Sequence, residues 1–200
     1  ADPQRAGPSG ALADIGTHAY QLIRYTTGLM PTEVSAQLQS LRTDRTLDDY
    51  GHVLVKFAGE VLGLVTVSQI THGQLNDLTL QIDGSLGSLS WRQETPNELV
   101  LRRFGQPMQV YERNPMADFT PESVRAANRL PAGHPEAFFE AFANVYRSSF
   151  DQMISHADGQ TTTERDTIFP NVYDGVEGVR FIEQSVASST EDGCWKPLTA

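Results

Sequence analysis

The order of its hydrophobic patterns is what most constrains the fold of this 200-residue chain. Between residues 34 and 104, apolar and polar side chains alternate as they do in strands, and Gly59-Glu60 and Asp83-Gly84 can form tight turns between strands. One helical pattern precedes this region and two follow it, after an irregular stretch at residues 105–133. The pattern predicts an α+β fold, with helices packed on one face of a largely antiparallel open sheet. The predicted strands are residues 34–41, 51–58, 61–70, 78–82, 86–91 and 99–104.

Three helices are predicted around these strands. The first spans residues 12–27 and ends at Gly28, since glycine favours the left-handed conformation that follows a helix. The second begins at Pro135, and the third begins near Asp174, where Glu177 completes a capping-box pattern. Apolar stripes predict which faces are buried. The stripes are Phe138, Phe142, Val145, Tyr146 and Met153 in the second helix, and Val172, Val176, Val179, Ile182 and Val186 in the third.

Charge and cysteine content exclude several classes of partner. The formal net charge is −10, from 15 basic and 25 acidic residues, so the chain lacks the basic surface that nucleic acids and anionic membranes require. No apolar run reaches membrane-spanning length. The single cysteine, Cys194, cannot form an internal disulfide, which favours a reducing, cytoplasmic compartment.

The predicted strand at residues 61–70 carries apolar side chains on both of its faces. Leu62 and Leu64 alternate with Val65 and Val67 rather than with polar residues. A strand of this kind is covered on both sides, by helices or by another subunit. An apolar sheet face left open therefore predicts a homo-oligomer.

Asp14 and His18 are the candidate catalytic residues. They lie four residues apart on the first predicted helix, and residues at this spacing share a helix face. A carboxylate can grip a substrate hydroxyl there while the imidazole removes its proton. Gly10 and Gly16 nearby allow a ligand or a backbone to approach closely. The alternative is a surface Asp–His pair worth a few tenths of a kcal/mol.

Three further residues are candidates for substrate binding. His72 and Asn76 follow a predicted strand and can hydrogen-bond a polyhydroxylated ligand, although a plain polar turn explains them as well. His134 can line a pocket or serve as a loop residue before the second helix. No spacing typical of a metal site, a phosphate-binding loop or a dinucleotide fingerprint occurs in the sequence.

The segments that carry these residues resemble one enzyme family. Residues 10–20 are similar to the D-x-G-x-H motif of the glucose-fructose oxidoreductase, inositol dehydrogenase and rhizopine-catabolism (Gfo/Idh/MocA) oxidoreductases. Residues 82–91 resemble the family's I-x-G-x-x-G-x-L segment, and Pro96-Asn97-Glu98-Leu99 follows as in bacterial members. Residues 133–144 resemble its late helix, and residues 169–189 its C-terminal helix.

The resemblance implies that this chain is the family's C-terminal substrate-binding and oligomerisation domain, over residues 1–200. It implies a dihydrodipicolinate-reductase-like or glyceraldehyde-3-phosphate-dehydrogenase-like domain that follows an N-terminal Rossmann domain absent from this chain. Asp14 would contact the substrate and His18 would transfer the proton. NAD or NADP, bound mainly by the missing domain, would accept hydride from a sugar or polyol. The sheet face would form the dimer contact, and the chain alone would be inactive.

Two other functions remain open at this point. Family relatives include a non-catalytic sensor, which binds its ligand without turnover. A freestanding interaction domain would use the sheet face alone. The presence of both Asp14 and His18 favours catalysis over a sensor.

Overall fold

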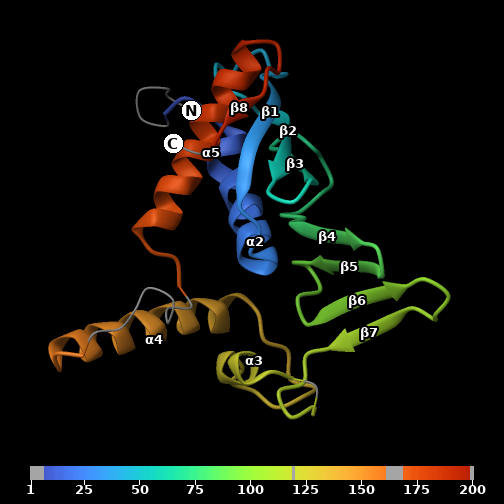
Figure 1. Ribbon diagram of the computed structural model, residues 1–200, viewed down its shortest axis with the longest axis vertical. Helices are drawn as coiled ribbons and strands as arrows, with labels where there is room; N and C mark the ends of the chain where they lie inside the picture. Colours follow the sequence, from blue (N-terminus) through green and yellow to red (C-terminus); the bar gives the residue numbers. More distant parts are fainter. Residues whose placement is uncertain (1–6, 119, 161–168, 199–200) are drawn as a thin grey trace. The chain divides into compact units, whose positions relative to one another are not determined.

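The computed structural model of the protein describes residues 7–118, 120–160 and 169–198 (Figure 1). They form two compact units. Unit 1 combines the residues up to Leu75 with those from Val172 onward, and unit 2 is Asn76–Asn171. Each unit has an antiparallel sheet and helices, which confirms the α+β prediction. The strands are divided between two four-stranded sheets instead of continuing through one.

Unit 1 contains the sheet with strand order β3-β2-β1-β8. All three pairings are antiparallel, and β2 and β3 form a hairpin. Its turn contains Gly59 and Glu60, both with positive φ, as the sequence predicts for a tight hairpin turn. The strands are β1 (Pro31–Gln39), β2 (Tyr50–Phe57), β3 (Val61–Ser68) and β8 (Lys196–Pro197).

The core of unit 1 lies on one face of this sheet. The helices against it are a π-helical turn η1 (Leu12–Gly16), the α-helix α2 (Thr17–Thr27) that continues it, and α5 (Val172–Thr190). Tyr20 of α2 stacks on Phe181 of α5, with ring centroids 4.4 Å apart. Because side chains alternate between the two faces of a strand, every second side chain of these strands packs against the helices. The buried core comprises Ala11, Leu12, Tyr20, Val34, Ala36, Val53, Val55, Phe57, Val65, Val67, Phe181 and Leu198.

Helix α5 packs through small residues rather than through its predicted valine stripe. Val172, Val176 and Val179 are exposed, so that part of the prediction was wrong. The buried positions are Gly178, Phe181, Ser185 and Ser188. Small side chains bring the helix close enough to bond the edge of β1, which the two-residue strand β8 covers only at Glu33 and Val34.

Two serines of α5 complete the hydrogen bonding of that edge. The Ser188 hydroxyl accepts from the backbone N–H of Ala36 at 2.9 Å, and the Ser189 hydroxyl accepts from that of Leu38 at 2.9 Å. An unpaired buried N–H costs about 1–3 kcal/mol, which explains the serines at positions 188 and 189.

Unit 2 contains the sheet with strand order β4-β5-β6-β7, in which each strand pairs with the next along the chain. The strands are β4 (Thr79–Gly84), β5 (Gly87–Arg92), β6 (Glu98–Arg103) and β7 (Gln109–Glu112). Two helices follow, α3 (Glu122–Ala127) and α4 (Phe138–Ala157). Strand β7 and helix α3 lie in the stretch at residues 105–133 that was predicted to be irregular, so the prediction missed both.

Helix α4 begins three residues later than predicted and does not bury its apolar stripe. The Glu140 carboxylate accepts from the backbone N–H of Ala137 at 2.9 Å, which fixes the start at Phe138 rather than at Pro135. The five predicted stripe residues, Phe138, Phe142, Val145, Tyr146 and Met153, are between 45% and 66% exposed. Their pattern identifies an apolar helix face, but it does not identify what covers that face. Of the helices described, none is long and apolar enough to cross a membrane.

A buried carboxylate holds the loop between β1 and β2. The Asp49 side chain is fully buried, and its two oxygens accept from the backbone N–H groups of Leu41 at 2.9 Å and Arg42 at 3.1 Å. Its own backbone N–H donates to Gln39, and its carbonyl accepts from Gln69. The Leu41 hydrogen bond is the main reason why the pKa of Asp49 lies below its usual value.

This lowered pKa predicts an acid-dependent loss of stability. Because the unfolded chain takes up the Asp49 proton near the ordinary pKa of about 3.9, Asp49 stabilises the fold fully above that value and progressively less below it. Asp49→Asn should lower the free energy of unfolding at pH 7 and flatten its decline between about pH 5 and pH 3. Urea unfolding across this pH range measures both effects. Equal slopes for the two proteins would contradict the prediction.

Candidate functional site

Asp14 and His18 lie on the first helix, on either side of a change in its winding. Asp14 belongs to the π-helical turn η1, and His18 is the second residue of α2. Both side chains are exposed. Single π-helical turns are rare and occur frequently at functional sites, because the looser winding redirects side chains.

The start of this helix is held by a carboxylate from the loop between β1 and β2. Asp48 accepts from the backbone N–H of Gly10 at 2.6 Å and from that of Leu12 at 2.9 Å. The Ser9 hydroxyl donates to it at 2.7 Å, and the Ala11 N–H donates to its main-chain carbonyl at 2.9 Å. The carboxylate satisfies donors that have no partner within the helix and places negative charge at the positive end of the helix dipole.

Two glycines make this arrangement possible. A Cβ atom on Gly10 would lie 2.4 Å from the carbonyl oxygen of Asp48. One on Gly16 would lie 2.6 Å from Cδ1 of Leu12 and 3.3 Å from Cγ1 of Val67 in β3. The close approach expected at these glycines is therefore made by the protein's own loop and core side chains.

Asp14 is hydrogen-bonded to the end of β3 rather than to His18. Nε2 of Gln69 donates to Oδ2 of Asp14 at 2.8 Å, and Nη1 of Arg45 donates to Oε1 of Gln69 at 2.7 Å. In the part of the chain that the structure describes, no hydrogen bond joins Asp14 to His18. The imidazole is thus positioned by its helix.

The buried side of α2 contains a residue that the sequence pattern missed. Tyr20 is buried, one helical turn after Gly16, and burial together with the charge of Glu177 raises its pKa to about 12. Arg24 counteracts this rise and forms an ion pair with Glu177 at 3.0 Å. The spacing of Leu12, Gly16 and Tyr20 at i, i+4 and i+8 was the signal that could have found it. Tyr20 stays neutral and serves the core.

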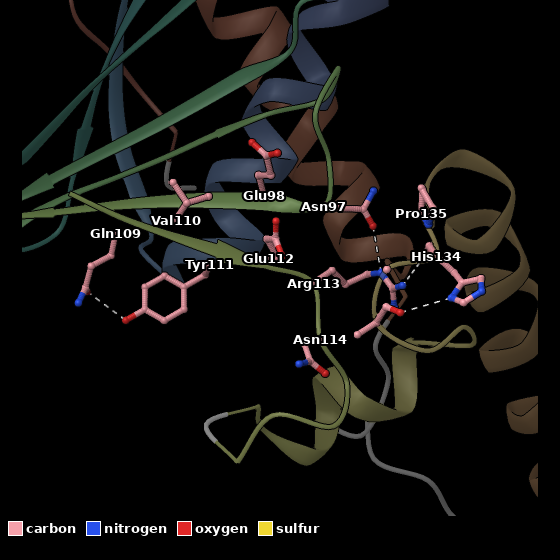
Figure 2. A pocket seen from close by; sticks show the side chains of 12 residues that line it. Asn97, Glu98, Gln109, Val110, Tyr111, Glu112, Arg113, Asn114, His134 and Pro135 are labelled. Atoms are coloured by element: carbon pink, nitrogen blue, oxygen red, sulfur yellow. Dashed lines mark hydrogen bonds between the residues drawn. The ribbon is translucent and has the colours of Figure 1, made fainter.

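The other three candidates are divided between the units. His72 lies in unit 1, in an exposed turn after β3, and Asn76 is the exposed first residue of unit 2. His134 lines an open cavity of about 760 Å³ in unit 2 (Figure 2). Glu98 and Glu112 line the same cavity, from paired positions of β6 and β7.

Arg113 organises one wall of this cavity (Figure 2). Its guanidinium donates to Oδ1 of Asn97 at 2.9 Å, to Oε1 of Glu136 at 3.2 Å and to the carbonyl of His134. The Arg113 and Glu136 side chains are only 15% and 8% exposed, and Glu136 also accepts from the backbone N–H of Arg129 at 2.7 Å. The sequence analysis did not single out this buried pair. The pair fixes the loop that carries His134, and the His134 ring remains exposed.

Among the described residues there is no cluster for a metal, and the start of η1 does not suit the phosphates of a dinucleotide. Among them, no group of three or more histidine, cysteine, aspartate or glutamate side chains could hold a metal ion. A dinucleotide's phosphates bind at helix N-termini through free backbone N–H groups. At the start of η1 those groups already bind Asp48, whose negative charge would repel a phosphate.

Comparison with known proteins identifies the class to which this fold belongs. Residues 1–90 match the model of the GFO/IDH/MocA C-terminal domain. The chain is 30% identical over 196 residues to the uncharacterized oxidoreductase YfiI of Bacillus subtilis (strain 168), covering 97% of this chain and 49% of that protein. Over 114 residues it is 29% identical to a levoglucosan dehydrogenase of Pseudarthrobacter phenanthrenivorans, covering 46% of this chain and 29% of that enzyme.

Among solved structures, the chain is similar to an inositol dehydrogenase homolog from Azotobacter vinelandii in complex with NADH and myo-inositol. The TM-score is 0.90 at 32% identity, covering 96% of this chain and 51% of the other. The fold and these likenesses define a domain of the kind found in oxidoreductases. By the domain model over residues 1–90 and by these likenesses, the chain is similar to the GFO/IDH/MocA C-terminal domain family. It spans about half the length of the relatives YfiI and the inositol dehydrogenase homolog.

The contacts of Asp48 predict that the helix bearing Asp14 depends on this one carboxylate. Asp48→Ala should lower the free energy of unfolding by about 1–2 kcal/mol, because it removes the helix cap. Asp44→Ala is the matched control, since Asp44 lies in the same loop and pairs with exposed Arg42 at the surface. Urea unfolding measures both variants. An Asp48→Ala protein as stable as the control would show that the cap is dispensable.

Proposed function

We propose that this chain is the substrate-binding part of an NAD- or NADP-dependent dehydrogenase that oxidises a hydroxyl of a sugar, an inositol or a related polyol. The observation that carries this proposal is the exposed pair Asp14 and His18, held on a helix whose start and buried face are fixed. The 32% identity to an inositol dehydrogenase homolog seen with NADH and myo-inositol supports the class of substrate and cofactor.

In this proposal Asp14 binds the alcohol and His18 takes its proton. An ionised carboxylate only accepts hydrogen bonds, so Asp14 can orient a substrate hydroxyl. A neutral imidazole has a ring nitrogen that can accept the hydroxyl proton as the carbonyl forms. Oxidation of an alcohol also needs a hydride acceptor, which this proposal assigns to NAD or NADP. The part of Asp14 and His18 is binding, orientation and proton transfer.

We also propose the three remaining candidates as residues that bind polyol hydroxyls, each within its own unit. His72, Asn76 and His134 are exposed and carry donors and acceptors suited to a polyol. The cavity at His134 supports this assignment, because amide and carboxylate side chains line it as well. A cytoplasmic location is part of the proposal, since the free, exposed Cys194 suits a reducing compartment.

The proposal further holds that the chain alone is inactive. The likeness of this chain to YfiI covers only 49% of that protein. At the start of η1, Asp48 already occupies the backbone N–H groups that a phosphate would need. Cofactor binding is therefore assigned to the other half of the full-length polypeptide, which we expect to be a Rossmann domain.

Replacement of the imidazole tests the proposed chemistry. In the full-length protein, His18→Ala should lower kcat by about 10²- to 10⁴-fold, because general base catalysis is lost. NADH or NADPH formation at 340 nm, with myo-inositol and levoglucosan as substrates, measures the change. His156→Ala is the matched control, since His156 is an exposed imidazole at the end of α4.

The same variants separate an enzyme from a ligand sensor. A sensor would bind its ligand without turnover in the unaltered protein, and His18→Ala would leave that binding in place. If His18→Ala and His156→Ala reduce turnover equally, the proposed role of His18 is contradicted.

We also propose that the open face of the unit 1 sheet joins two copies of this chain. Leu54, Leu62 and Leu64 lie on the face opposite the core, and they are 47%, 72% and 59% exposed. Leu54 is paired with Leu64 across β2 and β3, so the three leucines form one continuous apolar surface. Surfaces of this kind mark association sites.

A charge placed on this surface tests the assembly. Leu64→Lys should convert a dimer into a monomer, because a buried unpaired ammonium opposes association. Leu75→Lys is the control, since Leu75 is 84% exposed and lies in the loop after β3. Light scattering coupled to size exclusion gives the mass of each protein. A dimer that survives Leu64→Lys, or an unaltered chain that is monomeric, would refute this interface.

A further inference from the structure

Gln69 joins the proposed catalytic carboxylate to an arginine of the loop between β1 and β2. Its amide accepts from Nη1 of Arg45 at 2.7 Å and donates to Oδ2 of Asp14 at 2.8 Å. We propose that Gln69 is a positioning residue for Asp14 and that Arg45 sets the orientation of the Gln69 amide. This inference rests on the proposed function, since it assigns a role to Asp14.

The chemistry of the three groups allows only one orientation of the amide. A guanidinium only donates hydrogen bonds, so the oxygen of the Gln69 amide must face Arg45. The amide nitrogen then faces Asp14, where an ionised carboxylate can only accept. A glutamine between an arginine and an aspartate therefore has its two ends fixed by its neighbours, although it lies at the surface.

The main chain fixes the position of Gln69 as well. Its backbone N–H donates at 2.8 Å to the carbonyl of Asp49, whose side chain is fully buried. The carbonyl of Arg45 accepts from the Ser40 hydroxyl at 2.9 Å. Residues 40–49 thus carry Arg45, which orients Gln69, and also Asp48, which caps the helix. This one loop therefore fixes the position of the helix backbone at Asp14 and the orientation of the Asp14 carboxylate.

This arrangement commits one oxygen of Asp14 and leaves the other for a ligand. Oδ2 accepts from Gln69, and within the residues described no hydrogen bond is made to Oδ1. A carboxylate held at one oxygen loses rotational freedom before substrate arrives, so less entropy is lost when Oδ1 accepts a substrate hydroxyl. The contribution should appear mainly in the KM of the alcohol, because Asp14 would contact the hydroxyl before and during the reaction.

A double-mutant cycle in the full-length protein tests the role of Gln69. The probe is myo-inositol with NAD⁺, or levoglucosan with NAD⁺ if myo-inositol is not oxidised. Gln69→Ala should raise the KM of the alcohol about threefold to tenfold, with the KM of NAD⁺ and the melting temperature unchanged. In the Asp14→Ala background, Gln69→Ala should have no further effect. Arg45→Ala should raise the same KM by less than Gln69→Ala does. The Gln69 amide remains in that variant, but its oxygen and nitrogen can exchange places by rotation.

Gln81→Ala is the matched control. Gln81 is a surface glutamine of unit 2 that donates to both oxygens of Asp83, at 3.1 and 3.0 Å. It has the same chemistry without a proposed role, so its replacement should leave every kinetic constant unchanged.

The outcomes separate this inference from the function on which it rests. If Asp14→Ala leaves the kinetics unchanged, the proposed function fails. If Asp14→Ala impairs the enzyme and Gln69→Ala does not, only the positioning role fails. An equal effect of Gln69→Ala with and without Asp14 would mean that Gln69 contacts the substrate itself, and that also overturns the inference.

A readout independent of turnover examines the contact itself. In the 200-residue chain, the NMR signals of the Gln69 side-chain NH₂ group should move toward those of a free amide in Asp14→Ala. They should also move in Arg45→Ala, while the signals of Gln81 stay in place. Unmoved Gln69 signals in both variants would show that neither contact forms in solution and would overturn the inference.

Discussion

The hydrogen bonds of Asp48 are the contact on which the arrangement of unit 1 depends. A helix begins with backbone N–H groups that have no partner within the helix, and each one left unsatisfied near a core is costly. Here the carboxylate of Asp48 binds two of them, at Gly10 and Leu12. Since Asp48 sits in the loop between two core strands, it ties the helix directly to the sheet. Larger residues at Gly10 or Gly16 would push the helix away from this position.

Three acids of one short loop have three different tasks. Asp44 is exposed and pairs with Arg42 at 2.8 Å; this hydrogen bond lowers the pKa of Asp44 to about 2. Surface pairs of this kind contribute at most about 1 kcal/mol. Asp48 caps a helix, and Asp49 is buried against backbone N–H groups. The sequence shows only an acidic stretch, because each task is decided by donors that come from elsewhere in the chain.

The sequence was therefore most informative about local structure. Alternation and turn residues predicted the α+β class and the hairpin at Gly59-Glu60, and the left-handed Gly28 ends the first helix as expected. It was least informative about what each face packs against. Val172, Val176 and Val179 of α5 are exposed while Ser188 is buried, because a hydroxyl that binds the edge of β1 is worth more there than another methyl group. A hydropathy pattern does not show that the backbone N–H groups at the edge of a strand need hydrogen-bond acceptors.

The candidate site shows the same division between local and distant information. Asp14 and His18 could be chosen from the sequence, because their spacing, their flanking glycines and the motif around them are all local. Gln69 and Arg45 could not, since they come from 55 and 31 positions away and meet Asp14 only after the sheet has formed. Arg113 and Glu136 are likewise joined only by the fold of unit 2.

The first helix is fixed on every side except the one that carries Asp14 and His18. Its start is held by Asp48, and at its end the Gly28 N–H bonds the carbonyl of Arg24. Its inner face is closed by the stacking of Tyr20 on Phe181. A helix held in this way presents its outer groups with little backbone freedom, and a site built on a rigid element is more precise than one on a loop. Exposure of Asp14 and His18 then costs the fold almost nothing, while their positions are set by contacts on the other sides of the helix.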